Sequence, residues 1–339
     1  MVTPHLRPKK KPSHLWLLFS ITLLLFVTGW YLSLRFGAIA YRHDELIQVL
    51  THPLTNSSQQ DVIFDLRLPR SLAAILVGAA MSCAGAIIQG VTRNPIADPG
   101  LLGINAGAGL ALIIAYALFG SIHYTLVLCV CLIGSLVATL LVFSLAYHKK
   151  RGYNQLRLIL AGAMVSTLFS AIGQTLVLYF DLTTAVIGWQ AGGFVQINWK
   201  MLFIIAPFIL LGLLISQLLS HQLTILSLNE TVSKALGQKT MLITMSSLAV
   251  VLLLSGASVA LVGSISFIGL IIPHFVEIFV GKNYRLLLPF SAFVGATFLL
   301  WVDFITRIIN PPAETPISAI ISIVGLPCFL WLIRKGRRF

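Results

Sequence analysis

The residues from Leu15 to Leu34 read LWLLFSITLLLFVTGWYLSL, a stretch of twenty residues without a charged side chain. A helix needs about 20 predominantly apolar residues to cross the hydrocarbon core of a bilayer, so this stretch predicts a membrane-spanning helix. The apolar core of a secretory signal peptide has only about 7–15 residues and is followed by a cleavage site of small residues. We therefore expect this stretch to be retained as the first span of the protein.

Apolar blocks of this kind recur along the whole chain. It has 339 residues, of which 58% are hydrophobic and only 10% charged, whereas soluble domains carry about 25% charged residues. This composition excludes a water-soluble globule and predicts an all-α, polytopic membrane protein with about ten transmembrane helices. We expect a cytoplasmic tail at 1–14 and a transmembrane domain at 15–335. The expected spans are 15–36, 71–90, 100–119, 124–147, 157–180, 201–220, 241–261, 265–280, 286–306 and 316–333.

The distribution of basic residues favours one orientation of these spans. If both termini lie in the cytoplasm, roughly three quarters of the Lys and Arg residues fall in cytoplasmic segments, as the positive-inside rule requires. We therefore expect a multi-pass protein of the bacterial inner membrane with cytoplasmic N and C termini. The formal charge of +13 then reflects membrane topology and contact with lipid, and it does not indicate a nucleic-acid partner.

The sequence shows no sign of its own energy source or of a catalytic site. No acidic residue lies near the centre of an expected span, where ion-coupled transporters usually keep one. The acidic residues are also too scattered for a membrane-embedded enzyme, and the Gly281-Lys282 pair is not part of a nucleotide-binding P-loop. The four cysteines form no CxxC motif, so we expect buried thiols. We expect no catalytic residue, no metal site and no bound cofactor in this chain.

Two arginines stand three residues apart in the segment DLRLPR (65–70), at the start of the second span. Arg67 and Arg70 either extend to the membrane interface, as long basic side chains do, or bind acidic groups of an extracytoplasmic partner. Arginine suits the second role because its guanidinium binds a carboxylate through two hydrogen bonds. The residues alone leave both interpretations open.

A short helix is expected in the longest cytoplasmic loop, at 227–237. Ser227-Leu228-Asn229-Glu230 has the spacing of a capping box, and the Gly of Ala235-Leu236-Gly237 suits a helix end. Such a helix of about two turns lies either on the membrane surface or against a cytoplasmic partner, and the sequence does not distinguish the two.

Glycine, proline and small polar residues mark further features. The segment GSISFIGLIIPHF (263–275) predicts a broken helix, and NPIADPG (94–100) predicts a tight turn. Small residues also form stripes on the fifth and tenth spans, where they allow either close helix packing or a polar path for a solute. These stripes are Gly162, Ser166, Ser170, Gly173 and Gln174 on the fifth span, and Ser318, Ser322 and Gly325 on the tenth.

Taken in order, these motifs resemble the FecCD permease family, the membrane subunits of type II ATP-binding-cassette (ABC) importers for ferric siderophores, haem and cobalamin. The resemblance covers about residues 15–335. It rests on DLRLPR, NPIADPG, SISFIGLIIPH, and Glu314-Thr315-Pro316 before Gly325-Leu326-Pro327. One departure is Glu277, where the family commonly has a basic residue.

The resemblance implies a subunit that works as a pair, identical or paralogous, with the path at the pair interface. Two cytoplasmic ABC ATPases, which bind ATP and Mg, would drive it. A periplasmic or lipid-anchored binding protein would deliver an iron–siderophore, haem or cobalamin. The implied roles are docking of the binding protein for Arg67, Arg70 and Arg307; ATPase coupling for Ser227, Glu230, Ala235, Leu236 and Gly237; and the path or its cytoplasmic gate for Asn94, Ile96, Gly162, Ser166, Ser170, Gln174, Ser318 and Ser322.

Overall fold

The computed structural model describes residues 13–37, 39–51, 58–120, 122–148, 152–153, 155–228, 230–311 and 313–336. In this part of the chain, seven helices are long and apolar enough to cross a membrane, and three shorter apolar helices accompany them. The long helices are α1 (Ser13–Arg35), α4 (Leu68–Thr92) with the π-helical η1 (Asp61–Arg67) before it, α6 (Tyr124–Ala146), α7 (Gln155–Tyr179), α9 (Trp199–Leu218), α12 (Thr240–Val262) and α14 (Tyr284–Ile308). The shorter ones are α5 (Ile104–Phe119), α13 (Ile268–Val280) and α15 (Ile317–Gly336). Each coincides, within a few residues, with one expected span, which confirms the all-helical membrane fold.

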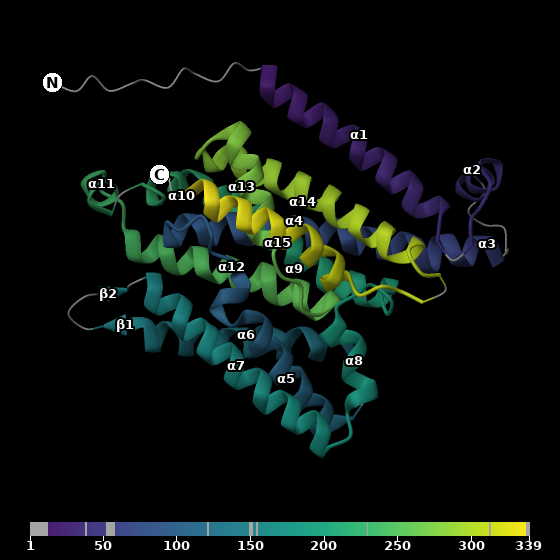
Figure 1. Cartoon of the computed structure of the whole chain (residues 1–339), viewed down its shortest axis with the longest axis horizontal. Coiled ribbons are helices and arrows are strands. Elements are labelled where there is room, and N and C mark those ends of the chain that lie inside the picture. Colours follow the sequence, from purple (N-terminus) through teal and green to yellow (C-terminus); the bar gives the residue numbers. More distant parts are fainter. Residues whose placement is uncertain are drawn as a thin grey trace.

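The remaining elements are short, and most of them lie at the two ends of the bundle. Figure 1 shows α10, α11, β1 and β2 at one end, together with the beginning of α1 and the end of α15, and α2 and α3 at the other. They are α2 (His43–Thr51), α3 (Ser58–Gln60), the 3-10 helix η2 (Pro99–Leu102), α8 (Thr183–Ala191), α10 (Ser220–Leu226), α11 (Glu230–Ala235), and the antiparallel pair β1 (Tyr147–His148) and β2 (Gly152–Tyr153). The sequence analysis anticipated only α11 among these.

Helix α4 forms the centre of the bundle because its surface is made of small residues. Almost every residue from Ala73 to Gly90 is buried. A Cβ atom at Gly78 would lie 2.3 Å from the carbonyl oxygen of Gly295, and one at Gly85 would lie 1.9 Å from that of Gly269. The backbones of α14 and α13 therefore touch the backbone of α4 directly, which is the close approach that small residues permit between helices in lipid.

The predicted break between α12 and α13 is confirmed. Gly263 ends α12 with a φ of 83°, and Phe267, at a φ of 71°, occupies the left-handed region immediately before α13. A bulky residue in that region is strained and is retained only where its surroundings hold it. The two helices thus form separate segments joined by an irregular turn.

Glutamine side chains compensate for two prolines inside the helices. A proline cannot donate to the carbonyl four residues earlier, so Pro273 and Pro289 free the carbonyls of Gly269 and Arg285. Gln89 Nε2 donates to Gly269 O at 3.0 Å, and Gln217 Nε2 donates to Arg285 O at 3.3 Å. Neighbouring helices thereby satisfy backbone groups that the bilayer cannot.

The expectation of buried thiols is met at only two of the four cysteines. Cys83 and Cys131 are buried, whereas Cys129 and Cys328 are exposed on α6 and α15. Both exposed thiols lie on apolar helices, so the pattern of apolar blocks could not separate inward from outward faces.

The contact between α4 and α13 generates the first testable prediction. Gly85→Ala places a methyl group against the Gly269 carbonyl, so we expect it to lower the free energy of unfolding by about 3 kcal/mol, the upper range for overpacking. Gly188→Ala is the matched control, because a Cβ there would come no closer than 3.8 Å to any neighbouring atom. Thermal unfolding of the detergent-purified proteins measures the stability of both variants. Equal melting temperatures of Gly85→Ala and Gly188→Ala would contradict the close contact.

Candidate functional site: a cavity between membrane helices and an arginine cluster

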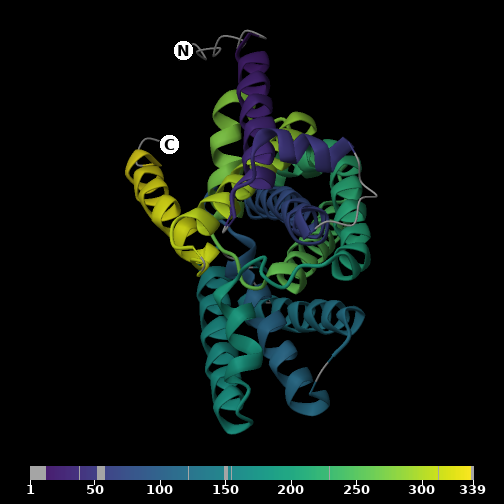
Figure 2. The same ribbon diagram turned by 90° about the vertical axis from the view of Figure 1, so that its right-hand side faces the viewer.

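A cavity of about 810 Å³ lies between α5, α7, α8 and the irregular turns before α5 and α13. Figure 2 shows α5, α6 and α7, in blue and teal, extending away from the central helices. The lining residues come from four separate stretches of the chain: 96–113, 159–174, 189–190 and 264–270. The fold therefore gathers the two Gly- and Pro-rich motifs and the stripe on the fifth span around one space.

The cavity contains most, but not all, of the residues predicted to form a path. Ile96, Gly162, Ser166, Ser170 and Gln174 line it. Asn94 lines a small adjoining pocket of about 20 Å³ and accepts a hydrogen bond from the Ile96 N–H.

Ser318 and Ser322 do not line this cavity. They lie on α15, where the Ser322 hydroxyl donates to the Ser318 carbonyl, and α15 (yellow) stands apart on one flank in Figure 2. The two stripes on the fifth and tenth spans are thus not brought together within one chain.

The sequence analysis did not assign several polar and aromatic groups to the cavity, although it had singled out neighbouring motifs. Asn105 donates to Ile265 O at 3.1 Å, and Trp189 Nε1 donates to Val259 O at 3.1 Å. The first bond ties α5 to the turn before α13, and the second ties α8 to α12. Only their convergence in space identifies them as cavity residues, since they are more than 60 positions apart in the sequence.

Asp98 is the one acidic residue in the cavity wall, in the connection between α4 and η2. Its side chain caps η2, with Oδ1 accepting from the Gly100 N–H at 2.8 Å. Oδ2 is buried and has no hydrogen-bond partner among the described residues. Burial raises the pKa of this carboxyl to about 6, because desolvation disfavours the charged form.

An arginine cluster lies at the opposite end of the bundle from α10 and α11. Arg70, in the first turn of α4, donates through Nε to Asp303 Oδ1 at 2.8 Å and holds both carboxylate oxygens of Glu314. Arg307 forms an ion pair with Asp303 Oδ2 at 3.1 Å and donates to the Ser33 carbonyl at 3.1 Å. Asp303 is completely buried, whereas the Glu314 side chain is 31% exposed.

Arg67 completes this cluster through backbone groups. Its guanidinium donates to the carbonyls of Leu34 and Ile39 and lies 4.7 Å from the centre of the Tyr41 ring. The structure thus brings the three predicted docking residues together, but each is at most 8% exposed and engaged inside the chain. The sequence missed Asp303 and Glu314 as partners of Arg70 because both residues are more than 200 positions from it. A docking role for the three arginines stays a prediction.

The expected coupling segment differs from its sequence-based description. Ser227 does not cap α11: it ends α10, and its hydroxyl donates to Thr224 O at 2.9 Å. The capping-box prediction is wrong because a serine can bond backward to its own helix. Gly237 ends the segment in the left-handed region, at a φ of 75°, as predicted.

Helices α10 and α11 form a small unit that is tied to the bundle. Ser233, on the buried side of α11, donates to Ile225 O at 2.8 Å. On its other side, Val232 and Leu236 are 45% and 62% exposed. Arg93, which ends α4, donates to Leu226 O at 3.1 Å. The unit is therefore connected through Arg93 to the turn that carries Asn94, Ile96 and Asp98.

Comparison with known proteins gives a consistent result over nearly the whole chain. The FecCD transport family matches residues 23–335. The iron(3+)-hydroxamate import system permease protein FhuB of Bacillus subtilis is 35% identical, over 93% of this chain and 82% of that protein. The molybdate import system permease protein MolB of Haemophilus influenzae is 36% identical, over 95% of this chain and 96% of that protein. A solved inward-facing conformation described as a metal-chelate type ABC transporter matches with a TM-score of 0.79 and 34% identity, over 94% of this chain and 99% of that one.

The arginine cluster generates the second prediction. Asp303→Asn removes the buried carboxylate between Arg70 and Arg307, and breaking a buried ion pair from one side costs about 3–5 kcal/mol of stability. Asp65→Asn, an exposed acid in η1, should change stability by no more than about 0.5 kcal/mol. Thermal unfolding in detergent compares the two. Equal stability of Asp303→Asn and the parent protein would show that the cluster contributes little to folding.

Proposed function

The chain belongs to the FecCD transport family, and on that basis we propose that it forms the membrane path for a ferric chelate, fed by an extracytoplasmic binding protein and driven by two ABC ATPases. The protein is a membrane-spanning permease subunit of an ABC importer, as its family and its apolar helices establish. The observation that carries the proposal is the cavity of about 810 Å³. It lies open between membrane helices and is lined by apolar and neutral polar side chains, many of them small, which suits passage of a large solute better than tight retention.

The proposed division of labour leaves ATP hydrolysis to the partner subunits. This chain would contribute the path and the surfaces that transmit motion. ATP and Mg would be bound by the ATPases, and this chain would bind no cofactor of its own. The exposed apolar side chains of Val232 in α11 and of Leu236 just after it support contact with an ATPase, because they project from a unit anchored to α4 and α14.

The same arrangement supports an orientation in the bacterial inner membrane. The end with α10 and α11 would face the cytoplasm, together with both termini, in agreement with the basic residues. The arginine cluster would then face the binding protein. Exposed apolar side chains on α7 and α15, such as Met164 and Ile323 at 70% and 69% exposure, are consistent with a second permease subunit packed beside this one.

An oxyanion is the second candidate substrate. It is favoured by one observation, the 36% identity to the molybdate permease protein of Haemophilus influenzae. Uptake of a ferric chelate and of molybdate by the same reconstituted complex distinguishes the two candidates.

Reconstitution tests the proposed function. The complex of permease, ATPase and binding protein in liposomes should take up a ferric chelate only with ATP, while the purified chain alone should not hydrolyse ATP. Val232→Pro should abolish uptake and leave ATP hydrolysis running, because proline inside a helix costs about 3 kcal/mol or more and would unfold α11. Normal uptake by Val232→Pro would exclude α11 as the coupling element, and hydrolysis by the chain alone would contradict the division of labour.

Charge reversal tests the docking role. Arg67→Glu should slow association with the binding protein, since charges at such surfaces govern encounter more than final affinity. Lys200→Glu is the matched control: Lys200 is exposed beside Trp199, whose indole bonds to Phe64 of η1, so it lies at the same end of the bundle. Surface-binding kinetics should show slow docking for Arg67→Glu and partial recovery with a binding protein in which an acidic contact is changed to Lys. Loss of stability without altered docking would indicate a purely structural role for Arg67.

A further inference from the structure

Arg93 ends α4 in a backbone conformation that an arginine rarely adopts. Its φ and ψ are 52° and 31°, in the left-handed region. A helix end of this shape is usually formed by glycine, because a Cβ atom is strained there. Strained residues of this kind are held by their surroundings and gather at sites that bind or switch. Glycine would form this helix end with less strain, so the role of Arg93 lies in its side chain.

The side chain of Arg93 reaches the end of the short helix α10. Its Nε donates at 3.1 Å to the carbonyl of Leu226, the last residue of α10. The last carbonyls of a helix have no partner within it and need donors from elsewhere. Arg93 is an exposed residue, so packing in the core does not explain its presence. The observed contact of its side chain is the tie between α4 and α10.

The end of α10 is also bonded to the segments that follow it. Ser233 of α11 donates to Ile225 O at 2.8 Å. Gln238, between α11 and α12, donates to Gln222 O at 2.8 Å. A force on α11 therefore acts on α10 first, and Arg93 joins α10 to α4.

In the chain, Arg93 leads directly into the turn of residues 94–98, here termed the cavity turn. The N–H groups of Arg93 and Asn94 both donate to Gln89 O. Near the other end of the turn, Ala97 O accepts from Gln89 Nε2 at 3.4 Å. The cavity turn is thus bonded at both ends to the last turns of α4, and a shift of Arg93 displaces it as a whole.

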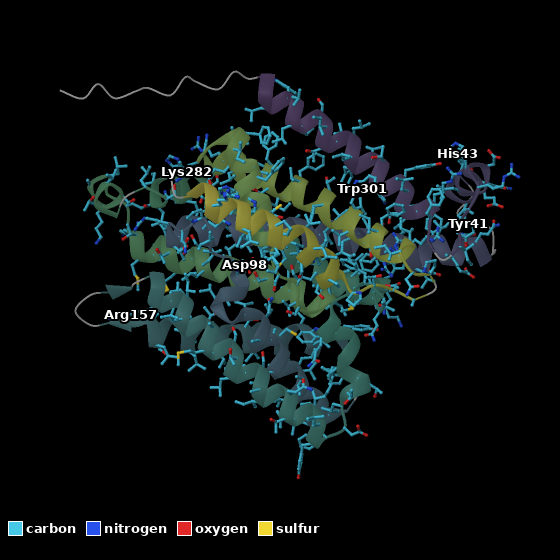
Figure 3. The ribbon with its side chains drawn as sticks, in the orientation of Figure 1. Tyr41, His43, Asp98, Arg157, Lys282 and Trp301 are labelled. Atoms are coloured by element: carbon cyan, nitrogen blue, oxygen red, sulfur yellow. The ribbon has the colours of Figure 1, made fainter. Side chains whose placement is uncertain are left out.

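The cavity turn forms part of the cavity wall, since Ile96 and Asp98 line the cavity. Figure 3 shows Asp98 near the middle of the molecule. Lys282, just before α14, lies toward the end of the bundle where Figure 1 labels α10 and α11. The connection from α10 through Arg93 to Asp98 therefore extends from that end of the bundle toward its interior, and displacement of the cavity turn changes the shape of the cavity.

We propose that Arg93 is a positioning residue that couples α11 to the cavity turn through its bond to Leu226 O. When an ATPase displaces α11, α10 moves with it, and the bond draws the end of α4 and the cavity turn in the same direction. The left-handed conformation lets one residue direct its side chain to α10 and the following backbone to the cavity. This inference rests on the proposed function, since it assumes that α11 contacts an ATPase.

Replacing Arg93 by glutamine and by methionine isolates this bond. Both variants lose the positive charge and keep a Cβ atom in the left-handed region, so the backbone strain is matched. Glutamine Nε2 stands as many bonds from Cα as arginine Nε does and donates, whereas methionine has no donor. In the reconstituted complex, ATP hydrolysis should continue in both variants. Uptake per ATP hydrolysed should fall about fivefold or more in Arg93→Met, within the range of coupling free energies, and stay close to the parent value in Arg93→Gln.

A third variant guards against failure of assembly. Arg93→Gly removes the donor and relieves the strain, so it should assemble at least as well as the parent protein and lose uptake per ATP as Arg93→Met does. Parent-like uptake per ATP in Arg93→Gly overturns the proposal, even if Arg93→Met does not assemble. An equal loss in Arg93→Gln and Arg93→Met assigns the effect to the charge and also overturns it. Lower thermal stability with unchanged uptake per ATP indicates a purely structural role.

Thiol labelling measures the movement itself. Ile96→Cys, with the exposed Cys129 and Cys328 changed to Ser, places a thiol on the cavity turn of the assembled complex. Its rate of reaction with an uncharged maleimide should change several-fold when ATP and vanadate are added. Arg93→Met should abolish this change, and Arg93→Gln should preserve it. An ATP-independent rate with Arg93 in place contradicts movement of the cavity turn.

The outcomes separate this inference from the proposed function. Failure of the parent complex to take up any chelate with ATP contradicts the proposed function. ATP-driven uptake that does not depend on Arg93 leaves the ABC importer in place and overturns only the coupling role of this residue.

Discussion

The direct contact of backbones around α4 is the constraint on which the rest of the structure depends. Lipid supplies no hydrophobic force to hold helices together, so close packing has to do so. Gly78 and Gly85 bring α14 and α13 against α4 without any intervening side chain. This spacing lets Gln89 reach the Gly269 carbonyl that Pro273 leaves free. The break before α13, and the cavity that it borders, are possible because α4 supplies both the contact and the hydrogen bond.

Buried polar groups occur in two arrangements, one of paired charges and one of mainly neutral side chains. In the arginine cluster every guanidinium meets carboxylates or backbone carbonyls, as buried charges require. In the cavity the groups are neutral except for Asp98, which has no basic partner among the described residues. The arginine cluster therefore stabilises one end of the bundle, whereas the cavity is lined almost entirely by apolar and neutral polar side chains. Arg93 connects this space to α10 and α11 at the other end.

The sequence predicts this fold well because long apolar stretches in a bilayer allow almost no structure other than helices. A helix lies at each of the ten expected spans, and seven of these helices are long enough to cross a membrane. Gly237 and Gly263 end helical segments as their conformational freedom suggests. The small helices α8 and α10 were not anticipated, since their short segments carry no distinct pattern. Ser227 was misassigned because a capping motif does not reveal which of two neighbouring helices it serves. The partners of Arg70 and the convergence of Asp98, Asn105 and Trp189 depend on contacts between distant segments, which no local pattern encodes.

The arginine cluster also determines the electrostatic field that a molecule experiences before it makes contact. Its three guanidinium groups enclose two carboxylates, so it carries one net positive charge although the sequence places three arginines there. Beyond the Debye length, about 8 Å at physiological ionic strength, an approaching molecule experiences little more than that single screened charge. A partner interacts with the full charge of one guanidinium only within hydrogen-bonding distance. At Arg70 this requires that a group of the partner replace Glu314. Long-range attraction at this end of the bundle therefore depends on that single net charge, which the change of one arginine to glutamate would reverse.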